Sequence, residues 1–180
     1  MDRCRGIQKG CPSRAIGEEP PPRLFRALAT LAAHQVRFIL IGGYAAIARG
    51  SPVLTSDIDI CYARDRANLE RLAAALKELG AALRGTPADV PFMLDAKTLE
   101  ARDSFTFSTN FGPLDCLGTP AGTLGFHDLD AAATDEDLDG FTVRVASLDD
   151  LIRMKRAAGR TKDRIALEWL GALRDELEQG

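Results

Sequence analysis

The sequence lacks the features that mark membrane, secreted and repeat proteins. Its longest apolar run, Phe38 to Ile41, is far shorter than the roughly 20 residues that cross a bilayer. The first residues lack the apolar core of a signal peptide, because basic residues interrupt them. The chain has no internal repeat and no low-complexity tract. We therefore expect a globular protein that works in the cytoplasm and has no membrane partner.

The sequence also lacks closely spaced cysteines and two common phosphate-binding motifs. Its four cysteines (Cys4, Cys11, Cys61 and Cys116) form no tight pair of the kind that binds zinc. We expect Cys61 and Cys116 to be small buried side chains in a reducing compartment. The Lys-Ser/Thr pair of a Walker loop and the three-glycine dinucleotide motif are both missing, which excludes those nucleotide-binding classes.

The net charge of −3 excludes a chain that binds nucleic acid through overall positive charge. Basic residues nevertheless concentrate near the C-terminus: Arg153, Lys155, Arg156, Arg160, Lys162 and Arg164. Two interpretations stay open for this basic cluster. It is either a solvated helix face with a basic connection or a surface that binds an anion.

The order of the patterns predicts an α/β or α+β domain, in which helices back a mixed sheet. Helical periodicity is found over 24–32, 69–79 and 148–158, and a last helix follows Thr161. Strand patterns cover 36–41, 57–60, 105–109, 114–117 and 141–145. We expect an irregular N-terminal extension over 1–22, a core over 23–146 and a C-terminal helical segment over 147–180. The stretch 81–102 is unreadable, and 118–139 reads as loop with a short helix from Leu129.

Three aspartates carry the clearest chemical signal. Side chains two residues apart on a strand share one face, so Asp57 and Asp59 converge on the same volume of solvent. Neighbouring carboxylates repel each other unless a cation lies between them, and Mg²⁺ prefers such hard oxygen ligands. Asp115, on a separate predicted strand, is placed to complete the cluster. A pair of solvated acids at a strand edge is the alternative for Asp57 and Asp59 alone.

Gly42 and Gly43 strengthen the chemical interpretation. They end a predicted buried strand and precede a short helix over 44–48, where the lack of side chains lets backbone N–H groups approach a phosphate. A tight turn between strand and helix explains the same glycines without a ligand. Together with the acids, they favour a nucleotide site.

The motif Ile41-Gly42-Gly43, followed after a spacer by Asp57-Ile58-Asp59-Ile60, resembles the signature of the polymerase-β-like nucleotidyltransferase superfamily. Leu114-Asp115-Cys116 is similar to its third carboxylate strand. The downstream segments 148–155 and 159–163 resemble minimal nucleotidyltransferase toxins, among them AbiEii-like abortive-infection proteins and the MenT toxins. The resemblance runs from about Phe25 to the C-terminal helix, and it implies the nucleotidyltransferase type of mixed sheet.

That resemblance implies an enzyme that uses Mg²⁺ or Mn²⁺ to transfer NMP, with CTP or UTP as donor, to the acceptor end of tRNA. Such transfer blocks aminoacylation, and a cognate antitoxin restrains it. One alternative is an antibiotic-type enzyme or one that modifies a protein. The basic cluster argues for an anionic acceptor over a polycationic drug. A non-catalytic domain that binds nucleotide or a partner is the remaining alternative.

The resemblance also implies roles for individual residues. Asp57, Asp59 and Asp115 would hold metal, and Asp115 would help to deprotonate the attacking hydroxyl. Lys155 and Arg160 would bind the triphosphate, with Asp163 holding Lys155 or a nearby arginine in place. The adjacent hydroxyls of Thr55 and Ser56 would bind phosphate, and phosphorylation of either would oppose NTP binding through added negative charge.

Overall fold

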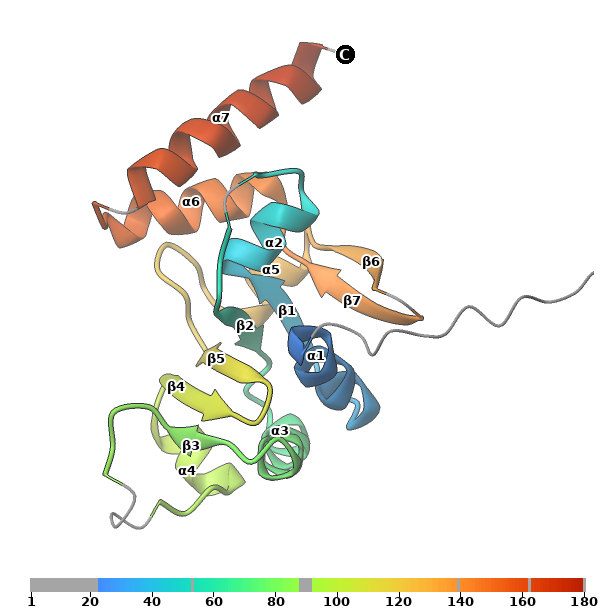
Figure 1. Ribbon diagram of the computed structural model, residues 1–180, viewed down its shortest axis with the longest axis vertical. Helices are drawn as coiled ribbons and strands as arrows, with labels where there is room; N and C mark the ends of the chain where they lie inside the picture. The colour runs from blue at the N-terminus through green and yellow to red at the C-terminus, as the bar shows by residue number, and fades with distance from the viewer. Residues whose placement is uncertain (1–22, 53, 88–91, 139, 162, 180) are drawn as a thin grey trace, which may run out of the picture.

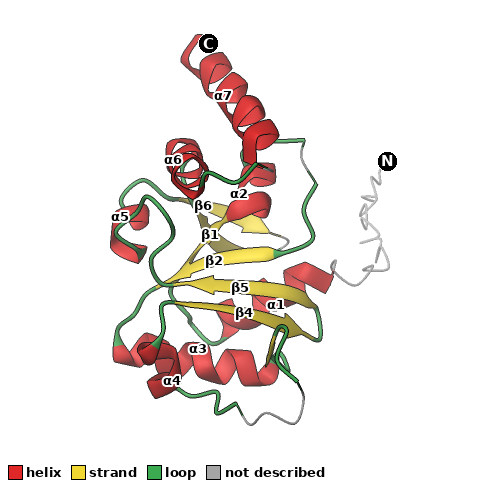
Figure 2. Ribbon diagram, turned by 90° about the vertical axis from the view of Figure 1, so that its left-hand side faces the viewer, coloured by secondary structure: helices red, strands yellow, loops and turns green. Residues whose placement is uncertain are grey.

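The computed structural model describes residues 23–52, 54–87, 92–138, 140–161 and 163–179. These residues form one mixed sheet, surrounded by helices (Figure 1). Figure 2 shows α1 behind the sheet, α3 and α4 below it, and α2, α6 and α7 above it. In the described part of the chain, no helix lies in front of β2, β5 and β4 in this view. On that side β4 carries exposed residues, whereas β2 is largely buried.

The described strands are hydrogen-bonded in the order β3-β4-β5-β2-β1-β7-β6. In chain order they are β1 Phe38–Ile41, β2 Ile58–Tyr62, β3 Ala82–Leu83, β4 Ser104–Thr109, β5 Gly112–Leu117, β6 Thr134–Leu138 and β7 Phe141–Val145. The helices are α1 Arg23–Ala33, α2 Gly42–Ala48, α3 Arg66–Glu78, α4 Ala96–Ala101, α5 Phe126–Asp130, α6 Leu148–Ala158 and α7 Asp163–Gln179.

The pairing of the central strands brings distant segments of the chain together. β1 and β2 are antiparallel, with Ile41 opposite Asp59. β2 and β5 are parallel, with Asp59 opposite Asp115. β4 and β5 form an antiparallel hairpin that carries β3 on its outer side. The ends of β1, β2 and β5 that carry the predicted site residues therefore meet.

Alternation along β4 and β5 explains how these strands pack. Phe105 and Phe107 of β4 are buried, and their rings stack with centroids 5.7 Å apart. Leu114 and Cys116 of β5 lie in the same core cluster. On β4, Thr106, which lies between the two phenylalanines, is exposed. Successive residues on a strand point to opposite faces, so β4 and β5 bury one face and leave the other more exposed, whereas the central strand β1 is buried throughout.

The predicted fold class is confirmed, and so is the burial of Cys61 and Cys116. The unreadable stretch 81–102 contains β3 and α4, and Asp95 caps α4 by accepting a hydrogen bond from the backbone N–H of Thr98. The predicted extension over 1–22 lies outside the described residues. Among the described helices, none is long and apolar enough to span a membrane.

Two element predictions need correction. The helix expected over 44–48 begins earlier, at Gly42, although Gly42 itself has a left-handed φ of +67°. The region 118–139, predicted as loop, contains the edge strand β6, and its short helix begins at Phe126 ahead of Leu129. β6 pairs only with β7 and is largely exposed, so its acidic sequence Thr134–Leu138 lacks the apolar alternation of a half-buried strand.

Candidate active site

The three predicted aspartates lie at the meeting point of β2 and β5. Asp59 is on β2, directly opposite Asp115 of β5. Asp57 lies one residue before β2, where the loop from α2 enters the sheet, and it is not part of the strand as predicted. Asp57 and Asp115 both contact the guanidinium of Arg84, so the three carboxylates share one region.

Gly42 and Gly43 begin α2 beside these acids, and neither position has room for a side chain. A Cβ on Gly42 would lie 2.1 Å from Oδ2 of Asp59, and the φ of Gly42 is +67°. A Cβ on Gly43 would lie 2.5 Å from Cβ of Thr55. The glycines are therefore required by close approach of the acid strand and its loop to the helix start. The predicted backbone access to phosphate is compatible with this packing but is not tested by it.

The pKa of Asp59 is raised to about 6, and burial is the main cause. The negative charges of Asp115 and then Asp57 raise it further. A hydrogen bond from the backbone N–H of Gly43 and the positive charge of Lys155 act in the opposite direction. The positive charge of the neighbouring side chains thus does not fully offset the negative charge of the three acids. Such an excess of negative charge favours the binding of a cation.

Arg84 is a site residue that the sequence did not reveal. It directly follows β3, and its guanidinium donates to Oδ1 of Asp115 at 2.9 Å and contacts Oδ2 of Asp57 at 3.4 Å. It also donates to the carbonyl oxygen of Phe107 at 3.3 Å. Arg84 belongs to the stretch 81–102, which has no motif, and only the pairing of β3 with β4 brings it to the acids.

Lys155 and Asp163 meet at the junction of α6 and α7. The Nζ of Lys155 lies 3.2 Å from Oδ1 of Asp163, and both side chains are mostly buried. This contact agrees with the positioning role expected for Asp163. Ser147 caps the start of α6 by accepting from the backbone N–H of Asp150, and Gly159 ends the helix with φ +62°. Local capping therefore fixes where Lys155 stands relative to the sheet.

The basic cluster does not form one surface. Arg153, whose side chain is 39% exposed, is paired with Asp128 and Asp150, with Nη2 to carboxylate distances of 2.9 and 2.7 Å. Lys155 is paired with Asp163, whereas Arg160 is exposed and no described contact joins its side chain to the acids. Lys162 lies outside the described residues. Arg156 and Arg164 are also exposed, so part of the cluster remains open to solvent.

Thr55 and Ser56 lie on the loop that leads to Asp57. The Oγ of Ser56 donates to Oδ1 of Asp57 at 2.7 Å, and the side chain of Thr55 packs against Gly43. Tyr44 donates its hydroxyl to the carbonyl oxygen of Thr55 at 3.1 Å. The pKa of Tyr44 is raised, first by burial and then by the charge of Asp57. The two hydroxyl residues are thus next to the acids, while their phosphate binding and phosphorylation stay predictions.

The chemistry of the donor set suits Mg²⁺ or Mn²⁺, because carboxylate oxygens are the ligands these ions prefer. The raised pKa of Asp59 is consistent with such a site, since a cation would offset the mutual repulsion. Within the residues that the structure describes, no group of three acidic, histidine or cysteine side chains is placed to hold a metal ion. In this arrangement Arg84 contacts two of the three acids.

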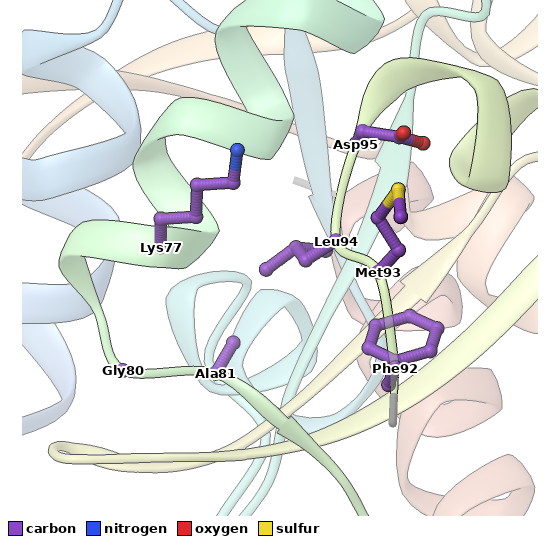
Figure 3. A pocket seen from close by; sticks show the side chains of 7 residues that line it. All are labelled: Lys77, Gly80, Ala81, Phe92, Met93, Leu94 and Asp95. Atoms are coloured by element: carbon purple, nitrogen blue, oxygen red, sulfur yellow. The ribbon is translucent and has the colours of Figure 1, made fainter.

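Hollows elsewhere on the molecule do not involve these residues. Figure 3 shows one of about 600 Å³, which is lined by the last turn of α3, the turn before β3 and the segment before α4. Phe92, Met93 and Leu94 give it an apolar wall, with Lys77 and Asp95 also lining it. None of the predicted site residues contributes to it. The candidate active site is therefore the acid cluster itself.

The mixed sheet backed by helices matches the fold of solved nucleotidyltransferases. The lincosamide antibiotic adenylyltransferase LnuA, solved with lincomycin bound, has a TM-score of 0.57 at 15% identity, over 84% of this chain and 96% of its own. A proposed nucleotidyltransferase, TM1012 of Thermotoga maritima, scores 0.54 at 16% identity, over 88% and 95%. The antibiotic-resistance factor ANT(2″)-Ia, in complex with adenylyl-2″-tobramycin, scores 0.52 at 17% identity, over 87% and 95%.

At these identities the likeness establishes the fold. No protein-family model matches the sequence. No curated protein matches it either. The structures named above do not confirm the toxin branch suggested by the sequence motifs, and two of them are antibiotic-resistance proteins.

Proposed function

We propose that the chain is a metal-dependent nucleotidyltransferase that moves NMP from an NTP to a hydroxyl acceptor. The observation that carries this proposal is the register of Asp59 with Asp115, beside Asp57 and the side-chain-free start of α2. The fold shared with LnuA and ANT(2″)-Ia supports it. The three carboxylates come from two strands and a loop, and they lie beside backbone that carries no side chain. Such a cluster suits phosphoryl transfer.

Each residue has a defined task in the proposed reaction. Asp57, Asp59 and Asp115 would hold Mg²⁺ or Mn²⁺, which would supply positive charge to offset that of the triphosphate and the leaving oxygen. Asp115 takes the proton from the acceptor hydroxyl. That oxygen forms a bond to the α-phosphorus, the bond to the bridging oxygen breaks, and pyrophosphate leaves.

Residues at the α6–α7 junction bind the donor in this proposal. Lys155 contacts the triphosphate as a compact cation, and Asp163 holds its ammonium group in position at 3.2 Å. Arg160, exposed on the connection between the helices, binds triphosphate or the acceptor backbone. Gly42 and Gly43 allow the triphosphate close to the backbone, and Thr55 and Ser56 offer hydroxyls beside it.

For the acceptor we propose the 3′ end of tRNA, with CTP or UTP as donor, in a toxin that a cognate antitoxin restrains. The motif resemblance over 148–163 supports this choice, and so do the exposed Arg156, Arg160 and Arg164. A phosphodiester backbone is the acceptor that such charges would attract. Arg153 adds nothing to this argument, because its charge is used within the fold.

A small hydroxyl compound is the second candidate acceptor. The observation that favours it is the likeness over most of both chains to LnuA, solved with lincomycin, and to ANT(2″)-Ia, solved with adenylylated tobramycin. A drug-like acceptor would lie on the sheet face next to Asp115. Protein acceptors remain an outcome of the same experiment.

The test incubates the purified chain with Mg²⁺ and each of four α-labelled NTPs, offered total tRNA, lincomycin, tobramycin or a cell lysate. We expect label at the 3′ end of tRNA with CTP or UTP, and none with the variant Asp59→Asn. Label on a small compound or on a protein would transfer the proposal to that acceptor class. Saturable Mg·NTP binding without transfer to any acceptor would instead indicate a non-catalytic nucleotide-binding domain.

A further inference from the structure

Arg84 stands in a row of side chains that crosses the face of the sheet bearing the acids. Its backbone N–H donates to the carbonyl oxygen of Thr106 at 2.9 Å, which continues the β3–β4 ladder by one residue. Thr106 is opposite Asp115 on β5, and Asp115 is opposite Asp59 on β2. Residues paired in this way share a face. The guanidinium therefore extends along the sheet surface toward the acids.

The guanidinium of Arg84 contacts three acceptor oxygens at different distances. The contacts with Oδ1 of Asp115, at 2.9 Å, and with the carbonyl oxygen of Phe107, at 3.3 Å, anchor one nitrogen, Nη2. The other nitrogen, Nη1, reaches Oδ2 of Asp57 at 3.4 Å. The distances of 3.3 and 3.4 Å are both outside the usual range for a charge-assisted hydrogen bond. Of the two carboxylates, Asp115 is therefore the one that Arg84 holds closely.

One guanidinium charge cannot offset three carboxylates. Arg84 contacts Asp57 and Asp115, and Lys155, the next basic side chain along the site, is paired with Asp163. A divalent ion that bridged the acids would compete with Arg84 for the same oxygens, because both are attracted to the same negative potential.

We propose that Arg84 is a displaceable internal cation that sets the metal concentration at which the site fills. Arg84 releases Asp57 when the ion binds and keeps its hold on Asp115 and on the Phe107 carbonyl. The inference rests on the metal binding of the proposed function. It adds a residue that tunes that binding, and it does not depend on whether nucleotide is transferred.

Direct measurement of Mn²⁺ binding, by the electron paramagnetic resonance signal of the free ion, tests this inference without any activity assay. We expect Arg84→Gln to bind Mn²⁺ about tenfold more tightly than the wild type, a change of about 1.4 kcal/mol. Arg84→Lys should give an intermediate affinity, because a single ammonium cannot contact both carboxylates. Metal should raise the melting temperature of Arg84→Gln more than that of the wild type, since the variant lacks the competing cation.

Arg64→Gln is a matched control, because the side chains of Arg64 and Arg84 are 34% and 36% exposed and both pair with an aspartate. Arg64 binds Asp103 instead of a site residue, so its Mn²⁺ affinity should stay within about twofold of wild type. If Arg84→Gln fails to fold, Arg84→Lys serves as the test variant, and its Mn²⁺ affinity should be about threefold higher than that of the wild type.

Unchanged or weaker Mn²⁺ binding by the Arg84 variants would overturn the inference, as would the absence of saturable binding in wild type and variants alike. Weaker binding would mean that Arg84 builds the site by holding the carboxylates together. Tighter binding without NMP transfer would leave the inference intact and refute the transferase proposal. The two failures are thereby distinguishable.

Discussion

Thr106 and Phe107 are neighbours on β4, yet they face opposite sides of the sheet and different environments. Phe107 is fully buried and stacks with Phe105, whereas Thr106 is exposed and stands opposite Asp115. The same alternation separates Leu114 from Asp115 on β5. One face of these strands therefore supplies the stability that the other face needs to hold charged groups together.

The largest effect on stability is expected from a substitution on the buried face. Phe107→Ala should lower the free energy of unfolding by about 3–5 kcal/mol, because it removes buried apolar surface and leaves a cavity. Thr106→Ala, one residue away, should change it by less than about 1 kcal/mol, as expected for an exposed strand position. Urea denaturation of both variants measures the contrast. Equal losses in the two variants would show that the two faces do not differ in this way.

A smaller effect is expected where α2 approaches the acids. Gly42→Ala should cost about 2 kcal/mol or more, from the positive φ and the contact with Asp59. Nucleotide transfer should fall by more than about 100-fold, because the helix start or Asp59 must move.

Gly171→Ala is the control for Gly42→Ala. Gly171 lies within α7, where an added Cβ meets nothing within 4 Å. The substitution should raise stability by about 0.5–1 kcal/mol through helix propensity and leave transfer unchanged. Thermal melts and the transfer assay together make the comparison. A harmless Gly42→Ala would contradict the close approach that the structure places there.

The smallest expected effect concerns the titration of Asp59. Its pKa should lie near 6, and Asp115→Asn should lower this pKa because it removes the negative charge opposite Asp59 on β5. Carboxyl ¹³C chemical shifts across pH measure both values. A wild-type pKa near 4 would contradict the burial and crowding of the three acids.

The same titration has a consequence for stability. Folded Asp59 keeps its proton up to about pH 6, whereas an unfolded aspartate releases it near pH 3.9. The folded state therefore binds more protons in this window, and the contribution of Asp59 to stability falls as the pH rises through it. Asp59→Asn should accordingly gain stability relative to the wild type between pH 4 and pH 6, with the full difference present above pH 6.

The sequence indicated those parts of the site whose signals are local. Gly42 and Gly43 end an apolar strand, and Asp57 and Asp59 are two residues apart, so neighbouring residues alone suggested a metal and phosphate site. Asp115 was found because it interrupts an apolar strand pattern. The fold class followed in the same way, from alternating helix and strand periodicities.

Residues that depend on tertiary pairing were missed or misread. Arg84 has no motif around it, and only the β3–β4 ladder directs it to the acids. Arg153 was counted with the basic cluster, but Asp128, far away in sequence, neutralises it within the fold. β6 was read as loop because an exposed edge strand needs no apolar alternation. Such features depend on partners that periodicity does not identify.

The central claim is that Asp57, Asp59 and Asp115 form a metal site for nucleotidyl transfer. The most direct measurement compares wild type and Asp59→Asn for Mg²⁺-dependent transfer of labelled NMP to tRNA, lincomycin, tobramycin and lysate proteins, with folding checked by thermal melting. The account predicts transfer to one of these acceptors by the wild type and a loss of at least about a thousandfold, or about 4 kcal/mol, in a folded variant. Retained transfer by folded Asp59→Asn, or no transfer by the wild type to any acceptor, would contradict it.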